Sequence, residues 1–281
     1  MTTGEATTVL VCGATGNVGR PLVERLLAEG HRVRALTRDP ARAGLPVGAE
    51  VARGDLTDTA SLVEVFAGVT AAHLIGFGGD HAPLRNGPEL VALATKAGVR
   101  KVTVLKGEAE TTGLDRAVAA ADWDHTFLSP VEFMSNSLEW ATQIRETGQI
   151  VDGFADVKSA MVHEADIASV AATVLTTDGH AGKEYWLTGP EALTARDRLA
   201  AIAAVLGRDI PFVELGRDEI VARWRAQGHG DEDIEFFLAM RTTPPEVAYT
   251  PLPTVEQVTG HPPRTYDQWV RAHETLFSPE A

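Results

Sequence analysis

The chain has 281 residues, 44% of them hydrophobic and 23% charged, with a formal net charge of −14. This composition is typical of a folded globular protein, and no apolar run is long enough to form a membrane-spanning helix. Because the negative charge repels phosphate backbones and anionic lipids, neither a nucleic acid nor a membrane is expected as a partner. The opening MTTGEATT lacks a signal-peptide pattern and Cys12 is the single cysteine, so we expect a cytoplasmic protein without disulfides.

From residue 8 to about 105, short β-rich runs alternate with helical patterns, which is typical of a parallel sheet with crossover helices. The predicted strands are TVLVCGA (8–14), HRVRALTR (31–38), AEVARGD (49–55), AAHLIGF (71–77) and KVTVL (101–105). The predicted helices are GRPLVERLLAEG (19–30), TASLVEVFAGV (59–69, with Asp58 as its cap) and GPELVALATKAGV (87–99). Five strands joined in this way indicate a doubly wound α/β fold.

The second half of the chain is less regular. A short helix (115–121), a sixth strand that Pro130 ends (124–130) and a well-patterned helix (164–176) come first. The remaining predicted elements are a strand at 183–190, a helix–strand pair at 195–207 and 210–215, helical stretches around 217–241 and 265–277, and an irregular Pro-rich connector at 242–254. No internal repeat or low-complexity linker interrupts them.

Three glycines lie directly between the first predicted strand and the first predicted helix. Gly13 suits the tight turn, Gly16 lets the backbone approach a pyrophosphate, and Gly19 allows close helix–sheet packing. The helix N-terminus that follows offers unpaired amides and a favourable dipole. The pattern therefore predicts a dinucleotide site, with a ligand-free βα turn as the alternative.

The end of the second strand indicates which dinucleotide is bound. An acidic residue there would bind a ribose diol and reject a 2′-phosphate, but this strand ends in Thr37 and Arg38, with Arg42 shortly after. Because a guanidinium suits a phosphate dianion, NADP(H) is favoured over NAD(H). The alternative is an exposed Arg38 with Asp39 as its partner. At the end of the third strand, Asp55 is placed to accept the adenine amino hydrogens.

Together these segments resemble the NmrA-like branch of the atypical short-chain dehydrogenase/reductases. The segments that carry the resemblance are 11–40 (VCGATGNVGRPLVERLLAEGHRVRALTRDP), 54–58 (GDLTD), 126–136 (TFLSPVEFMSN), 162–175 (VHEADIASVAATVL), 184–194 (EYWLTGPEALT) and 258–270 (VTGHPPRTYDQWV). The resemblance implies an NADP-binding Rossmann domain over 1–128, its sheet completed by roughly 151–190. It also implies a smaller α/β substrate-binding lobe over 129–150 and 191–281.

The resemblance also implies which residues form the cofactor site. The expected contacts are Gly13, Thr15, Gly16, Asn17, Val18, Gly19, Thr37, Arg38, Asp55, Leu56, Gly76, Phe77, Leu105 and Lys106. No metal is expected, because a helix start explains His163, Glu164 and Asp166 better than a ligand set does.

The segment SPVEFMSN (129–136) matches a family segment that usually reads RPxxFMxN and borders nicotinamide and substrate, with Ser129 in place of the arginine. An apolar wall with one amide would suit a flat hydrophobic ligand, and an interdomain core is the alternative. The expected substrate contacts are Phe133, Met134, Asn136 and Trp140.

The usual catalytic pair of short-chain reductases is a Tyr-x-x-x-Lys, whose tyrosine donates a proton as hydride arrives. This chain has three tyrosines, Tyr185, Tyr249 and Tyr266, and none precedes a lysine by four residues. The fifth strand ends instead in Lys106, followed by Glu108. An ammonium there could polarise a carbonyl, and a solvated lysine that pairs with Glu108 is the alternative.

Three functions therefore compete. The first is an NADPH-dependent reductase of a small hydrophobic carbonyl, quinone or polycyclic aromatic substrate. The second is a non-catalytic regulator that senses NADP(H), which the missing tyrosine fits. The third is a cyclase or isomerase of the same fold that uses Lys106 and Glu108 as acid and base. Either a monomer or a homodimer is compatible with the sequence.

Overall fold

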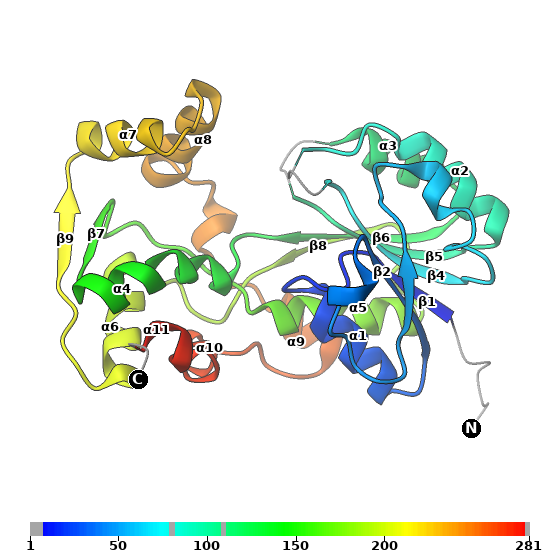
Figure 1. Ribbon diagram of the computed structural model, residues 1–281, viewed down its shortest axis with the longest axis horizontal. Coiled ribbons are helices and arrows are strands. Elements are labelled where there is room, and N and C mark those ends of the chain that lie inside the picture. Colours follow the sequence, from blue (N-terminus) through cyan, green and yellow to red (C-terminus); the bar gives the residue numbers. More distant parts are fainter. Residues whose placement is uncertain (1–7, 79–81, 108–110, 279–281) are drawn as a thin grey trace. The chain divides into compact units, whose positions relative to one another are not determined.

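The computed structural model describes residues 8–78, 82–107 and 111–278 and contains two compact units (Figure 1). Unit 1 comprises Met1–Pro130, Glu164–Leu187 and Thr254–His261, and unit 2 comprises Val131–His163, Thr188–Pro253 and Pro262–Ala281. In the part of the chain that the structure describes, no helix is long and apolar enough to cross a bilayer.

Unit 1 is built on a seven-stranded parallel sheet. Its strands are β1 (Thr8–Val11), β2 (Arg32–Thr37), β3 (Glu50–Arg53), β4 (Ala71–Ile75), β5 (Lys101–Leu105), β6 (Asp124–Pro130) and β8 (Lys183–Leu187), in the order β3-β2-β1-β4-β5-β6-β8. The order reverses between β1 and β4, which is where doubly wound folds bind their ligands. The predicted doubly wound α/β fold is therefore confirmed.

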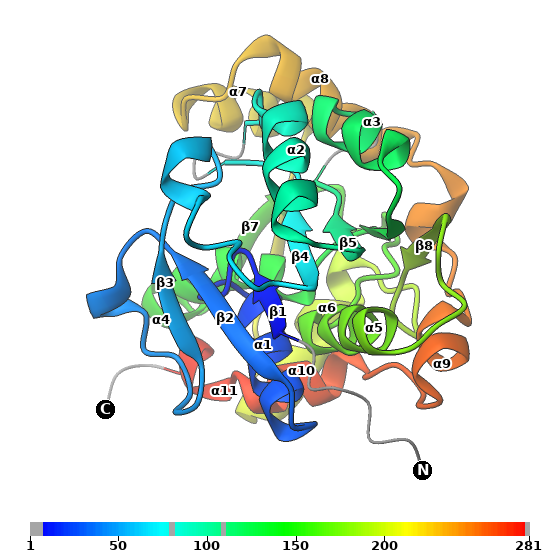
Figure 2. The ribbon, with the colours of Figure 1, turned by 90° about the vertical axis from the view of Figure 1, so that its right-hand side faces the viewer.

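Helices cover both faces of this sheet. The helices α1 (Gly19–Ala28) and α5 (Glu164–Thr176) pack together on one face, and α2 (Gly87–Ala97) and α3 (Gly113–Ala120) cover the other (Figures 1 and 2). A further short helix, α9 (Thr254–Thr259), packs against α5. Because α5 lies between the sheet and other helices, it is buried along most of its length, Glu164 and Asp166 included.

The helix predicted for residues 59–69 is wrong. A single 3₁₀ turn, η2 (Thr59–Leu62), begins there, and Asp58 caps it by accepting a hydrogen bond from Ala60 N at 3.1 Å. β-branched side chains and Gly68 make the segment a poor helix former. Its apolar side chains still enter the core, as Leu62 and Phe66 show.

Unit 2 has its own small sheet, in which β7 (Ile150–Gly153) pairs in parallel with β9 (Phe212–Leu215). Within the segment 151–190 that was expected to complete the large sheet, β8 does so, whereas β7 joins β9 through backbone hydrogen bonds and buries Ile150 in the core of unit 2. The helices of unit 2 are η3 (Met134–Trp140), α4 (Ala141–Thr147), α6 (Ala195–Leu206), α7 (Arg217–Ala226), α8 (Asp231–Thr242), η4 (Glu246–Tyr249), α10 (Tyr266–Ala272) and α11 (Glu274–Phe277).

Candidate functional site

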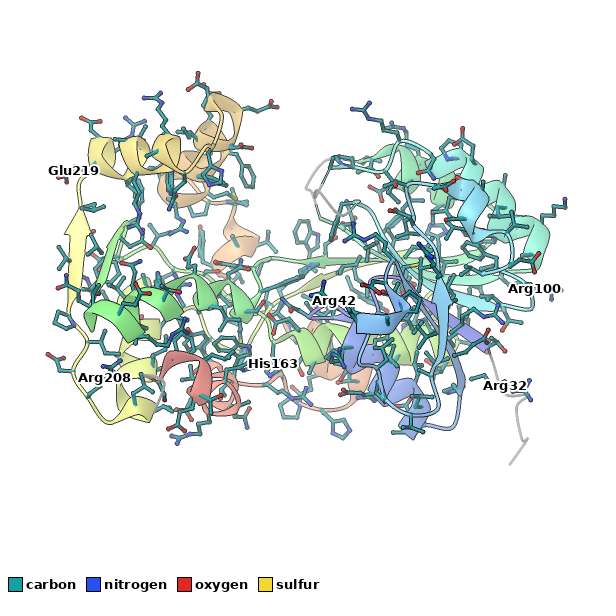
Figure 3. The ribbon with its side chains drawn as sticks, in the orientation of Figure 1. Arg32, Arg42, Arg100, His163, Arg208 and Glu219 are labelled. Carbon is teal, nitrogen blue, oxygen red and sulfur yellow. The ribbon has the colours of Figure 1, made fainter. Side chains whose placement is uncertain are left out.

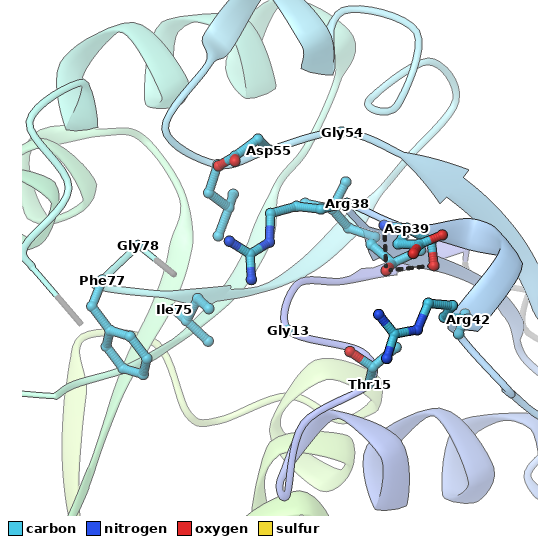
Figure 4. Close-up of a pocket in the computed structure, with 14 residues that line it drawn as sticks. Gly13, Thr15, Arg38, Asp39, Arg42, Gly54, Asp55, Ile75, Phe77 and Gly78 are labelled. Carbon is cyan, nitrogen blue, oxygen red and sulfur yellow. Dashed lines mark hydrogen bonds between the residues drawn. The ribbon is translucent and has the colours of Figure 1, made fainter. Parts of the chain in front are cut away.

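A cavity of about 540 Å³ lies in unit 1 at the carboxyl ends of β1, β2, β3 and β4 (Figure 4). Seven of the expected cofactor contacts line it: Gly13, Thr15, Thr37, Arg38, Asp55, Leu56 and Phe77. The other seven are not among its lining residues: Gly16, Asn17, Val18, Gly19, Gly76, Leu105 and Lys106. The position at the reversal of strand order is the expected one for a nucleotide in this fold.

The glycine loop is packed tightly against the first turn of α1. Gly13 has a φ of +63°, a conformation that L side chains rarely adopt. A Cβ on Gly19, the first residue of α1, would lie only 2.1 Å from the carbonyl oxygen of Gly13. The first turn of α1 contains no acidic residue, and its N-cap, Val18, makes no side-chain cap hydrogen bond. Within the turn, Arg20 N donates to the carbonyl oxygen of Gly16 at 3.1 Å and Pro21 has no N–H. What suits an anion such as a pyrophosphate is therefore the close approach that the glycine loop allows, together with the positive end of the helix dipole.

Two arginines extend into the cavity. The guanidinium groups of Arg38 and Arg42 both point into the space beside the glycine loop, and that of Arg42 lies near Thr15 (Figure 4). Among the described residues, neither guanidinium has a hydrogen-bond or ion-pair partner. The carboxylate of Asp39, considered as a partner for Arg38, instead accepts a hydrogen bond from Ala41 N at 3.2 Å. Two guanidinium groups that make no ion pair with a described residue, in a chain of charge −14, favour the binding of an anion at this point.

The carboxylate of Asp55 is held in the cavity wall as an anion. Its Oδ1 accepts hydrogen bonds from Thr57 N at 2.9 Å and from Thr57 Oγ1 at 2.8 Å. These two hydrogen bonds lower the pKa of Asp55, and the nearby positive charge of Arg38 adds to the effect.

Asn86 fixes the same segment, and the sequence analysis did not identify it. Its Nδ2 donates to the carbonyl oxygen of Leu56 at 2.8 Å and to Thr59 Oγ1 at 2.7 Å. An asparagine before Gly87 and Pro88 at the start of a helix reads as an N-cap, yet its side chain makes no cap hydrogen bond. A contact across 30 residues leaves no local pattern that could have revealed it.

The Lys106 side chain takes part in an ion pair. Its Nζ lies 3.3 Å from Glu184 Oε1, and the hydroxyl of Ser129 donates to the same oxygen at 2.6 Å. The Lys106 side chain is only 12% exposed, and its Nζ lies 6.0 Å from the ring centroid of Phe127. It is therefore not a freely solvated lysine. Glu108, which was considered with Lys106, lies outside the described residues.

The end of β5 adjoins the wall of the cavity. Gly76 N donates to the carbonyl oxygen of Leu105 at 3.2 Å. A Cβ on Gly107 would lie 2.6 Å from the Phe77 ring, and Phe77 lines the cavity. Lys106 is thus one residue away from a direct contact with the cavity wall.

The expected substrate contacts belong to unit 2 and do not share one exposed surface. Met134 and Trp140 are buried in its core, each only 1% exposed, whereas Phe133 is half-buried and Asn136 exposed. The Trp140 Nε1 donates to Asp152 Oδ2 at 3.2 Å, and the Arg198 guanidinium lies 4.8 Å from the centre of its ring system. In this structure only Phe133 and Asn136 keep surface that a ligand could contact.

Known proteins match this chain over nearly its whole length. The model of the NmrA-like family matches residues 5–104. The (4-alkanoyl-5-oxo-2,5-dihydrofuran-3-yl)methyl phosphate reductase of Streptomyces griseus is 35% identical over 97% of this chain and 100% of its own length. The NAD(P)H azoreductase of Xenophilus azovorans is 29% identical over 96% of this chain and 99% of its own length.

A solved structure agrees with these relatives. The NADPH-dependent quinone oxidoreductase QOR2 of Escherichia coli, crystallised with NADPH, superposes with a TM-score of 0.75 at 25% identity, over 94% of this chain and 99% of that one. The resemblance to it spans both units of the chain. An end-to-end match at 35% identity shows shared descent rather than a shared fold alone, and we conclude that the chain belongs to the NmrA-like family.

Proposed function

We propose that this protein is an NADPH-dependent oxidoreductase that reduces a small hydrophobic carbonyl, quinone or polycyclic aromatic substrate. The observation that carries the proposal is the cavity of unit 1, where a glycine loop lies together with Arg38 and Arg42, whose guanidinium groups make no ion pair with a described residue. A dinucleotide with a 2′-phosphate satisfies both features, because its pyrophosphate suits the glycine loop at the start of α1 and its 2′-phosphate suits the two guanidinium groups. When bound, NADPH supplies a hydride.

Each group of residues would hold one part of the cofactor. Gly13 and the first turn of α1 would bind the pyrophosphate, Arg38 and Arg42 the 2′-phosphate, and Asp55 the adenine amino group. The anionic state of Asp55 suits it to accept hydrogen bonds. Because Asn86 and Thr57 restrain the segment around Asp55, that acceptor is already oriented before the cofactor arrives.

Because the chain has no Tyr-x-x-x-Lys pair, we expect its substrate to be a conjugated hydride acceptor. Reduction of a saturated ketone leaves an alkoxide about as basic as hydroxide, so an acid must donate a proton as the hydride is transferred. Reduction of a quinone leaves a phenolate, comparable to tyrosine with a pKa of about 10. Such an anion can form beside a positive charge and take its proton from water. Lys106 would supply that charge, and a role for Glu108 stays a prediction.

The names of the relatives support the expectation of a conjugated substrate. Their names specify as substrates a quinone, an azo compound and a (4-alkanoyl-5-oxo-2,5-dihydrofuran-3-yl)methyl phosphate. All three are unsaturated acceptors over which the charge left by a hydride can spread, so none of them requires a strong acid at the moment of transfer.

The test is a pairwise panel of acceptors. Purified protein and NADPH are mixed with a naphthoquinone, with an α,β-unsaturated ketone and with its saturated counterpart, and the loss of NADPH absorbance is followed. We expect turnover with the conjugated acceptors and little with the saturated ketone. Equal rates with both ketones would contradict the argument from the missing acid. Tight NADPH binding without turnover of any acceptor would instead support the sensing regulator.

A further inference from the structure

We propose that Glu184 and Ser129 are positioning residues that hold the Lys106 ammonium at the carboxyl end of the sheet, where it stabilises the oxyanion of the reduced substrate. This inference rests on the proposed function. It assigns a role to β8, which is the edge strand of the sheet and its last strand in sequence, and to a serine at the end of β6.

Three neighbouring strands meet in this cluster. Lys106 follows β5, Ser129 is the penultimate residue of β6, and Glu184 lies on β8 opposite Phe127 of β6. One carboxylate oxygen, Glu184 Oε1, accepts from Ser129 Oγ at 2.6 Å and lies 3.3 Å from Lys106 Nζ. Ser129 is only 5% exposed, and Lys106 Nζ lies over the Phe127 ring, 6.0 Å from its centroid. A shared acceptor and an aromatic support fix a side chain that would otherwise be flexible.

The cluster lies where the reactive end of the cofactor is expected. Four strand spacings separate β3 from β5 in this sheet, which is roughly 19 Å at about 4.8 Å per strand. If the adenine end lies over β2 and β3, beside Arg38 and Asp55, an extended dinucleotide ends over β4 and β5. Phe77 forms the cavity wall there and abuts Gly107, the residue that follows Lys106.

The chemistry of the step needs a fixed positive charge and no other group. Transfer of a hydride to the conjugated acceptor brings two electrons, leaves NADP⁺ and places a negative charge on an oxygen of the reduced acceptor. A proton from water then completes the reduced product. An ammonium has three N–H donors, and the ion pair with Glu184 occupies one of them. No other described residue accepts a hydrogen bond from this ammonium, so the remaining donors can serve the substrate oxygen.

The first arm of the test needs neither substrate nor cofactor. The rate at which an amine-reactive reagent labels Lys106 is measured by mass spectrometry of the cofactor-free protein. Glu184→Gln and Ser129→Ala should raise that rate several-fold, because the ammonium is released to solvent, and Ser129→Thr should keep the wild-type rate. The matched control is Asp178→Asn, which removes the ion pair of Lys101 at the opposite end of β5, where Lys101 Nζ lies 2.9 Å from Asp178 Oδ1. This variant should leave the labelling rate of Lys106 unchanged.

The second arm measures turnover of a quinone. Loss of an oxyanion-stabilising donor typically costs about 10²-fold or more in kcat, so Lys106→Ala should show a loss of that order. Glu184→Gln should lower kcat by about tenfold through misplacement of the ammonium, with little change in KM. In the Lys106→Ala background, Glu184→Gln should have almost no further effect, and Asp178→Asn should leave kcat unchanged.

Each outcome decides between the two proposals. If wild-type protein turns over quinone while Glu184→Gln keeps full kcat, or keeps the wild-type labelling rate of Lys106, the positioning role is refuted and the proposed function stands. Equal losses from Glu184→Gln with and without Lys106 would also refute it, since Glu184 would then act independently. If none of the acceptors tested causes wild-type protein to oxidise NADPH, the proposed function fails, and the role of the cluster in catalysis fails with it.

Discussion

Replacement of Arg38 by alanine tests the cofactor assignment most directly. The Arg38 guanidinium points into the cavity of unit 1 and, among the described residues, has no hydrogen-bond partner that would have to be broken. Its removal should therefore cost the contact with the 2′-phosphate and little else. We expect weaker binding of NADPH and unchanged binding of NADH, which lacks that phosphate.

The size of the effect follows from the exposure of the site. A hydrogen bond to a charged group contributes about 1.5–3 kcal/mol, and an exposed guanidinium lies at the lower end because water and salt screen it. A loss near 1.5–2 kcal/mol corresponds to an NADPH affinity roughly 10- to 30-fold weaker. Because Arg42 points into the same space (Figure 4), Arg42→Ala should have an effect of similar size.

The assay is calorimetric titration of NADPH and NADH into wild-type and variant proteins at fixed salt. Arg32→Ala is the matched control, since Arg32 is an exposed arginine at the opposite end of β2, far from Arg42 (Figure 3). An unchanged ratio of NADPH to NADH affinity in Arg38→Ala would refute the 2′-phosphate assignment. So would an equal loss for both cofactors, because it would indicate a general disturbance of the cavity.

Three further predictions follow from packing and burial. Gly19→Ala should destabilise unit 1 by at least about 2 kcal/mol in chemical denaturation, because a Cβ there meets the Gly13 carbonyl. The control is Gly113→Ala at the first position of α3, where a Cβ has free space around it and no such loss is expected. Asn86→Ala should weaken NADPH and NADH alike by about 1 kcal/mol, so a change in their affinity ratio would contradict the role given to it. Burial lowers the pKa of His73 to about 4, below its ordinary value of about 6.5. The free energy of unfolding should therefore fall by up to about 3 kcal/mol as the pH drops from about 6.5 toward 4, because the unfolded chain binds the proton first. His73→Leu should flatten that part of the curve of unfolding free energy against pH.

The sheet of unit 1 could be predicted because its information is local. Runs such as KVTVL and TVLVCGA are short, β-branched and bounded by turn residues, and each becomes a strand. The glycine loop between the first strand and the first helix could be predicted for the same reason. The structure of segment 59–69 could not be predicted, because its apolar spacing suits a helix while its β-branched residues and Gly68 favour turns.

The contacts that complete the candidate site could not be predicted, because they join residues far apart in the chain. Lys106 meets Glu184 across 78 residues, and Asn86 meets Leu56 across 30. Both contacts depend on which strands become neighbours in the sheet, and the β6–β8 pairing has no signature in either strand. In unit 2 the hydrophobic character of Trp140 was visible, but the sequence did not distinguish a ligand-facing wall from the buried core in which it lies.

The alternation of chain segments between the two units has a consequence for dissection and biosynthesis. The chain passes from one unit to the other after Pro130, His163, Leu187, Pro253 and His261. No single continuous fragment can therefore be expressed as either unit alone, and a truncation at residue 163 would lack both α5 and the edge strand β8. On the ribosome, the sheet that carries the cavity stays incomplete until the residues of β8 emerge, after the first segment of unit 2 has already been made. Isolated cofactor-binding fragments of this protein should therefore be designed with two linkers, one that joins Pro130 to Glu164 and one that joins Leu187 to Thr254, and not by cutting the chain once.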